Sequence, residues 1–224
     1  MNNYYEPLIS VIVPIFNAEE TLERLLNSMI NSTYRNIEII LINDGSTDGT
    51  SLVIEKYKYI DERIITFYQR NKGPAAARLK GFEMSKGEWV YFADSDDYVE
   101  GSIFSKLLDI HYNVGFDVIQ FSWNTVKTNE KILKNSTKTT SYIEGNKNIV
   151  KSFLEDQIGF SVYNKLFRRK LFDNIILLNS KTGEDGPLVL QLISNADKIV
   201  LICTSSVRTV LPAECITLVL YFIK

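Results

Sequence analysis

Three carboxylates, Asp94, Asp96 and Asp97, follow directly after the apolar run from Trp89 to Ala93. The run has the composition of a strand buried on both faces, and ligands of open α/β sheets bind at the carboxyl ends of such strands. Carboxylates crowded at this point repel one another unless hydrogen bonds or a cation offset the repulsion. A divalent cation that prefers oxygen ligands would do so. The segment therefore predicts a cation site, while a plainer alternative is that Asp97 caps the following helix.

The loop from Asn43 to Thr50 is polar and follows a second apolar run, Ile37 to Ile42. Its acidic spacing approaches that of an EF-hand, but an EF-hand loop follows a helix and this one follows a predicted strand. Two interpretations of the loop remain open. Either Asp44 faces the crevice and accepts a hydrogen bond from a ligand N–H, or the loop is a capped turn in which Thr47 or Asp48 starts the next helix.

The apolar residues recur with the periods of an alternating series of strands and helices. Strands are expected at residues 9–16, 37–42, 64–68 and 89–93, and helices at residues 22–30, 50–59 and 75–84. Asn17 is expected to cap the first helix, and Pro74 suits the first turn of the third. This alternation predicts an α/β fold with an open, mostly parallel sheet and helices on both faces.

After Gly101 the pattern is weaker. Helices are expected at residues 102–112, 146–154 and 183–194, and strands at residues 117–123 and 198–202. The polar stretch from Thr125 to Ser141 is expected to be an exposed loop or hairpin. The chain is predicted to be one domain whose two halves divide near residue 100.

Composition and charge exclude several classes of protein. With 45% hydrophobic residues, 23% charged residues and a net charge of −2, the 224-residue chain is globular and lacks the basic surface of a nucleic-acid-binding protein. The lone His111 and the pair Cys203 and Cys215 form no zinc or Ser/His/Asp pattern. The short polar start and an apolar end below the roughly 20 residues of a membrane span predict no signal peptide and no transmembrane segment. We expect a reduced, cytoplasmic protein.

Other nucleotide and phosphate chemistries lack their motifs. No GxGxxG follows the first strand, which counts against a dinucleotide dehydrogenase, and the chain contains no GxxxxGKS/T, which excludes a P-loop enzyme. A nucleophilic aspartate of the phosphatase type is expected after the first strand, where Pro14 to Asn17 stand instead. A sugar nucleotidyltransferase would need a Gly- and Arg-rich loop at the same place, and residues 14–20 provide none.

Several motifs occur in a fixed order along the chain. They are Val11–Glu19, Asn43–Asp48, Asn71–Arg78 and Asp94–Asp97, followed by Tyr163–Phe167 and Glu184–Asp185. This series closely resembles the family 2 glycosyltransferases, which have the GT-A fold. The resemblance implies a Rossmann-like nucleotide-sugar-binding half at about residues 8–100 and a smaller acceptor and catalytic half at about 101–202. Residues 203–224 do not follow the family pattern, so we expect an atypical or truncated tail.

The resemblance implies an inverting, metal-dependent glycosyltransferase whose donor is a nucleotide-sugar, expected to be UDP-linked. The residues expected to bind the donor lie in the first four motifs and are Pro14, Phe16, Asn17, Glu19, Asp44, Gly73, Arg78, Asp94 and Ser95. Among them, Phe16 would stack on the base, Asp44 would accept from the uracil N–H and Asp94 would contact ribose or metal. Asp96 would coordinate Mg²⁺ or Mn²⁺, which assists the departure of UDP as a Lewis acid.

On the acceptor side, the resemblance assigns Asp185 the role of the general base that deprotonates the acceptor hydroxyl. The alternative is that Glu184 and Asp185 are first-turn acids favoured by the helix dipole. Tyr163, Asn164, Lys165 and Glu184 would line the donor-sugar or acceptor side, and the first three could instead form a structural turn. The acceptor would be the hydroxyl of a glycan or lipid-linked molecule in surface polysaccharide synthesis, at the inner face of the membrane. A second hypothesis is a nucleotide-binding relative that is catalytically defective because its tail leaves no acceptor site.

Overall fold

The computed structural model describes residues 5–127, 132–135, 140–176, 183 and 185–211. In chain order, its elements are β1 (Ile9–Ile15), α1 (Leu22–Ile30), β2 (Ile37–Asn43), α2 (Thr50–Ile60), β3 (Ile64–Tyr68), α3 (Pro74–Met84), β4 (Trp89–Phe92), β5 (Asp97–Val99), α4 (Ile103–Val114), β6 (Val118–Lys127), β7 (Ile132–Asn135), β8 (Ser141–Glu144), α5 (Asn146–Leu154), β9 (Lys165–Arg168), the short 3₁₀ helix η1 (Arg169–Phe172), α6 (Asp185–Ser194) and β10 (Lys198–Leu211). Strand and helix alternate strictly as far as β4, as the apolar periodicity predicts.

The strands form one sheet in the order β3-β2-β1-β4-β9-β6-β10-β5, with β7 paired to β6 and β8 paired to β10. The pairs β1–β2, β2–β3 and β1–β4 are parallel, and so is the pair β6–β10. β9 joins the two halves of the sheet, because it pairs antiparallel with both β4 and β6. The open α/β fold is confirmed, and its parallel half directs the carboxyl ends of β1, β2 and β4 to one edge.

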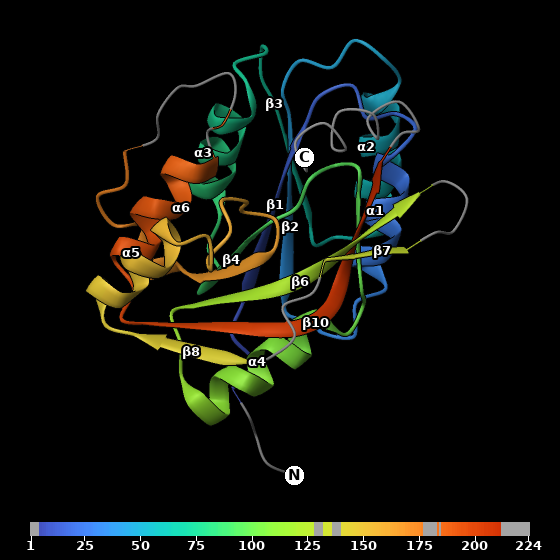
Figure 1. The fold of residues 1–224 in the computed structure, drawn as a ribbon. Helices are drawn as coiled ribbons and strands as arrows, with labels where there is room; N and C mark the ends of the chain where they lie inside the picture. Colours follow the sequence, from blue (N-terminus) through green and yellow to red (C-terminus); the bar gives the residue numbers. More distant parts are fainter. Residues whose placement is uncertain (1–4, 128–131, 136–139, 177–182, 184, 212–224) are drawn as a thin grey trace.

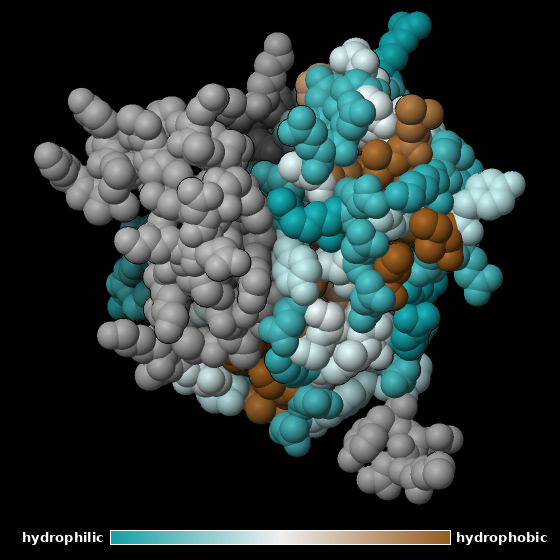
Figure 2. Space-filling model, turned by 90° about the vertical axis from the view of Figure 1, so that its right-hand side faces the viewer, coloured by the Kyte–Doolittle hydropathy of each residue, from teal (hydrophilic) through white to brown (hydrophobic). Residues whose placement is uncertain are grey.

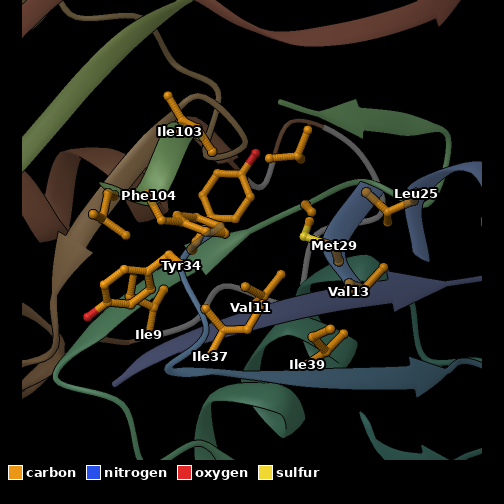
Figure 3. Packing of buried hydrophobic residues seen from close by; sticks show 14 of the residues in the cluster. Ile9, Val11, Val13, Leu25, Met29, Tyr34, Ile37, Ile39, Ile103 and Phe104 are labelled. Carbon is orange, nitrogen blue, oxygen red and sulfur yellow. The ribbon is translucent and has the colours of Figure 1, made fainter. Parts of the chain in front are cut away.

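Helices cover both faces of this sheet (Figure 1). On one face α1, α2 and α4 pack against Val11 and Val13 of β1, and Figure 3 shows part of this core with Leu25 and Met29 of α1. On the other face α3, α5 and α6 contribute to a second core, in which Ile12 of β1 also lies. Successive strand side chains point to opposite faces, so β1 supplies both cores and is apolar along its whole length.

Asp97 does not cap a helix, which makes that alternative wrong. The residue opens β5, where it is 1% exposed, and its N–H donates to the Asp94 carbonyl at 3.0 Å. Residues Asp97 to Val99 are extended because they pair antiparallel with β10, and α4 begins only after Ser102.

In the second half of the chain, two β-strands are longer than the sequence pattern indicates. β6 continues to Lys127 and pairs with β7, which confirms the hairpin expected after residue 124 for the part that the structure describes. β10 runs past Ile202 to Leu211, with an irregular register between Ile202 and Val207. The remainder of the expected atypical tail, residues 212–224 with Cys215, lies outside the described residues.

The surface on the side of α1 and α2 is largely hydrophilic, with its hydrophobic residues in small separate groups (Figure 2). Leu52 and Ile60 of α2 are among the exposed hydrophobic side chains. Within the described ranges, none of the helices combines the length and the apolar character that crossing a membrane requires.

Candidate functional site

A cleft of about 600 Å³ lies at the carboxyl ends of β1, β2 and β4. Its lining residues come from the loops after these strands and from the start of α3, and they are Pro14, Ile15, Phe16, Asp44, Asn71, Lys72, Gly73, Pro74, Ala77, Arg78, Asp94, Ser95 and Asp96. The volume lies in the range of sites for small molecules and cofactors. The parallel sheet thus brings the first four sequence motifs to one place.

Most of the predicted donor-binding residues line this cleft. They are Pro14, Phe16, Asp44, Gly73, Arg78, Asp94 and Ser95, and the predicted metal ligand Asp96 joins them. Phe16 is 51% exposed, so its ring is available to a planar ligand. Asn71 and Lys72, which open the Asn71–Arg78 motif, also line the cleft, although neither was predicted to bind the donor.

Asn17 and Glu19 are not among the lining residues. The Oδ1 of Asn17 accepts from the Thr47 N–H at 2.8 Å, and the Oε2 of Glu19 accepts from the Gly49 N–H at 2.8 Å. Both side chains therefore hold the loop after β2 against the loop after β1. The prediction that Asn17 caps α1 is wrong, because the N-cap of that helix is Thr21 and the Asn17 backbone has φ = 49°.

Asp44 is buried at the tip of β2 and organises the neighbouring loop. Its Oδ1 accepts from Gln69 Nε2 at 2.7 Å and from the Lys72 N–H at 2.9 Å, while Oδ2 accepts from the Gly73 N–H at 2.8 Å. A carboxylate offers about four acceptor positions, so one remains for a ligand N–H. Gln69 was not recognised from the sequence, because nothing in its spacing links it to Asp44.

The start of α3 forms one wall of the cleft. Its N-cap Gly73 has φ = 89°, a conformation that glycine adopts without steric strain, and Pro74 occupies the first turn. Free backbone N–H groups and the helix dipole favour negative charge at such an end. A phosphate group in the cleft would meet this favourable end of the helix.

Arg78 connects two carboxylates that are far apart in the sequence. Its Nη2 donates to Asp94 Oδ1 at 3.2 Å, and its Nη1 donates to Asp185 Oδ1 at 2.8 Å. The arginine side chain is 6% exposed, whereas those of Asp94 and Asp185 are 34% and 24% exposed. The predicted base therefore lies beside the predicted donor site, and Arg78 holds the two together.

The environment of Asp94 disfavours its charge. Burial raises the pKa of the Asp94 carboxyl, the Arg78 guanidinium opposes this shift, and the neighbouring Asp185 and Asp96 carboxylates raise the pKa further. A cation bound in the cleft would relieve this repulsion. The backbone carbonyl of Asp96 also accepts from the Arg24 guanidinium, which fixes the turn that carries these carboxylates.

The carboxylates of Asp94 and Asp96 are suited to bind a cation whose remaining ligands come from the substrate and water. Among the described residues, no group of three or more His, Cys, Asp and Glu side chains is placed to hold a metal ion. Mg²⁺ is usually bound by one or two carboxylates together with substrate phosphates and waters. Two hard oxygen donors on the wall of a cleft that also contains the amino end of α3 fit this requirement, while Asp97 is buried and absent from the lining.

Asp185 is the first residue of α6, as expected for the start of the last helix. Its Oδ2 accepts from the Val162 N–H at 3.4 Å, in addition to the ion pair of Oδ1 with Arg78. The side chain is thus held from both sides at the first position of α6. Glu184 lies outside the described residues.

Tyr163, Asn164 and Lys165 differ in their surroundings. Burial, together with the Asp97, Asp94 and Asp185 carboxylates, raises the pKa of the Tyr163 phenol to about 12 against an opposing hydrogen bond with Ser161. The phenol therefore faces the acidic side of the site. Asn164 and Lys165 are 6% and 0% exposed. Asn164 lies in the turn before β9 and Lys165 is the first residue of that strand, so neither is among the residues that line the cleft.

Comparisons with known proteins agree with this geometry. The profile of Glycosyl transferase family 2 matches residues 10–176. The glycosyltransferase GlyA of Streptococcus pneumoniae serotype 4 is 32% identical over 200 residues, which are 86% of this chain and 29% of that protein. The uncharacterized glycosyltransferase EpsJ of Bacillus subtilis is 29% identical over 204 residues, 86% of this chain and 58% of that protein. The chain thus spans between about a third and somewhat over half of these relatives.

A solved structure shares the fold. Residues 1–349 of S. aureus TarS in complex with UDP-GlcNAc superpose with a TM-score of 0.78 at 23% sequence identity, covering 91% of this chain and 58% of that one. The expected GT-A-type fold is confirmed by this likeness.

Proposed function

This chain belongs to glycosyl transferase family 2, and we propose that it is an enzyme that moves a sugar from a UDP-sugar to an acceptor hydroxyl with inversion. The acceptor is a glycan or a lipid-linked molecule of surface polysaccharide synthesis. The observation that carries the proposal is the position of Arg78, which joins Asp185 to the carboxylate end of the cleft. A base is thereby held within reach of the donor site, where it would take the proton of an acceptor hydroxyl that attacks the anomeric carbon on the face opposite the departing UDP.

The cleft offers complementary groups for each part of a UDP-sugar. Phe16 presents an exposed ring for the uracil, and Asp44 keeps an acceptor position for its N–H. The amino end of α3 favours the negative diphosphate. The presence of UDP-GlcNAc in the TarS structure supports a UDP-linked donor.

Asp94 and Asp96 would hold Mg²⁺ or Mn²⁺ together with the diphosphate. When bound, the cation acts as a Lewis acid that neutralises charge on the departing UDP. Arg78 places a fixed positive charge beside Asp94, so this side of the cleft remains suited to the leaving group.

Asp185 would take the proton from the acceptor hydroxyl. Its carboxylate is partly exposed, while Arg78 and the Val162 N–H orient its two oxygens. A base that is held in this way needs little reorganisation when the acceptor arrives.

The proposal is tested by incubating the purified chain with a panel of UDP-sugars, beginning with UDP-GlcNAc, in the presence of Mn²⁺. We expect slow release of UDP through transfer of the sugar to water, because Asp185 can deprotonate water as well as an acceptor. Binding of UDP without turnover of any UDP-sugar in the panel would contradict the catalytic proposal and agree with the nucleotide-binding alternative.

A further inference from the structure

Lys165 is a lysine in the interior of the sheet. It opens β9, is 0% exposed and lies opposite Gln120 of β6. Placing an ammonium group away from water is costly unless hydrogen bonds satisfy it. A buried lysine can hold neighbouring segments in place through hydrogen bonds that an apolar side chain cannot form.

The ammonium group of Lys165 is held by hydrogen bonds to the loop of residues 159–164 and not by an ion pair. Nζ donates to the Ser161 carbonyl at 2.6 Å and to Asn164 Oδ1 at 3.0 Å. Among the described residues, no carboxylate forms an ion pair with Lys165. Burial lowers the pKa of Lys165 to about 7, and the more distant Asp185 carboxylate opposes this shift.

The same loop is fixed to β6 at its two ends. The Gly159 N–H donates to Gln120 Oε1 at 2.9 Å, and Asn164 Nδ2 donates to the Phe121 carbonyl at 3.2 Å. The Phe121 N–H in turn donates to the Asn164 carbonyl at 3.0 Å. Lys165 therefore supplies the attachment at the middle of the loop, next to Val162.

The middle of the loop is the part that reaches the site. The Val162 N–H donates to Asp185 Oδ2, and the Tyr163 phenol faces Asp94, Asp97 and Asp185. Arg78 holds Oδ1 of Asp185, so the loop provides the constraint on the other oxygen.

We propose that Lys165 is a positioning residue for the transfer reaction, which holds the loop of residues 159–164 so that Val162 fixes the orientation of the Asp185 carboxylate. The inference rests on the proposed function, in which Asp185 is the base. Lys165 itself is buried and is not among the residues that line the cleft, so the role proposed for it acts through the loop.

The test compares Lys165→Met with the wild type in two independent measurements. The first is the rate of UDP release from the UDP-sugar that the wild type hydrolyses, with kcat and KM determined separately. A small misplacement of a catalytic group costs about 10²-fold, so we expect kcat to fall by about that factor while KM and the affinity for UDP with Mn²⁺ stay within about twofold. The second is hydrogen exchange of the amides, in which protection should be lost at residues 159–164 and kept in α3 and β1.

Two further variants sharpen the comparison. Lys165→Gln keeps a donor for the Ser161 carbonyl and should retain more of kcat than Lys165→Met. Lys147→Met removes an exposed lysine of α5 and should leave kcat, exchange and thermal stability unchanged.

Wild-type kcat and unchanged Val162 exchange in Lys165→Met would overturn the proposal. Uniform loss of protection throughout the chain would also overturn it, because Lys165 would then be a general stability residue. If the wild type turns over no UDP-sugar, the proposed function fails, while local loss of exchange protection still supports the role of Lys165 in holding the loop.

Discussion

The guanidinium of Arg78 lies 2.8 Å from the carboxylate of Asp185, a residue 107 positions further along the chain. The same guanidinium reaches Asp94 at 3.2 Å. One buried cation thus separates two carboxylates that have different tasks in the proposed reaction. The relationship links α3 in the first half of the chain to α6 in the second half, and it makes the site dependent on both.

Replacing Arg78 by methionine should destabilise the protein. Asp94 and Asp185 would face each other without a cation, and breaking a buried pair leaves uncompensated charge. Because the carboxylates are 34% and 24% exposed, we expect a loss of about 1–3 kcal/mol in the free energy of unfolding at pH 7, less than for a fully buried pair. Urea denaturation measures this loss, and it should shrink as the pH falls and the carboxylates are protonated.

Lys80→Met is the matched control for Arg78→Met. Lys80 lies on the same helix and pairs with Glu83, but it is 34% exposed and remote from Asp94. Its replacement should change stability by less than about 0.5 kcal/mol, the usual range for surface substitutions. Equal effects of the two variants would contradict the bridging role of Arg78.

Asp44→Asn should weaken binding of UDP. The carboxylate accepts from two backbone N–H groups and from Gln69, and an amide can offer only one oxygen to them. The second backbone N–H would lose its partner, at a cost of about 1–3 kcal/mol, and the loop before α3 would shift. Titration calorimetry with UDP and Mn²⁺ should show affinity at least about tenfold lower. Unchanged affinity would show that this loop does not shape the donor site.

Removal of the divalent cation should stop turnover, and addition of Mn²⁺ should restore it. Asp96→Ala should abolish the Mn²⁺-dependent turnover, because only Asp94 would remain of the two carboxylates proposed to hold the cation. Asp109→Ala, at an exposed position of α4, is the control and should keep full activity. Turnover by Asp96→Ala at the wild-type rate would remove Asp96 from the metal site.

The lowered pKa of the buried Lys165 predicts how the free energy of unfolding changes with pH. Its pKa in the folded protein is about 7, below the ordinary value of 10.5, so between these values the unfolded chain binds more protons than the folded one. The stability of the wild type should therefore rise from about pH 7 to pH 10.5 relative to that of Lys165→Met, and the difference should be constant below pH 7. Unfolding measured in urea at a series of pH values tests this, with Lys147→Met expected to follow the wild type. Parallel curves for wild type and Lys165→Met would contradict the lowered pKa.

Local sequence pattern was sufficient to predict the first half of the fold. Uninterrupted apolar runs identify β1, β2 and β4 because each strand packs against a hydrophobic core on both faces. In β1, Val11 packs into one core and Ile12 into the other. Asp44 and Asp94, which follow β2 and β4, lie in the cleft, since parallel strands end at the same edge. The family resemblance added the roles of Asp96 and Asp185, which spacing alone does not distinguish from caps and first-turn acids.

The second half depends on contacts that no local pattern contains. β5 and β9 are three and four residues long, and they are strands only because β10, β4 and β6 offer them hydrogen-bonding partners. Asn17 could both cap a helix and join two loops, and the tertiary fold selects the second. The ion pair between Arg78 and Asp185 and the loop held by Lys165 arise from packing of α3, α6 and β9, so sequence spacing could not predict them.

The most direct test of the account is the rate of UDP release from the accepted UDP-sugar by Asp185→Asn, measured beside its affinity for UDP with Mn²⁺. Asparagine keeps the shape of the side chain and cannot accept the proton. We expect affinity for UDP within about threefold of the wild type and a rate reduced by at least about 10²-fold, the usual contribution of a general base. A rate close to that of the wild type, with UDP still bound, would contradict the assignment of Asp185 as the base.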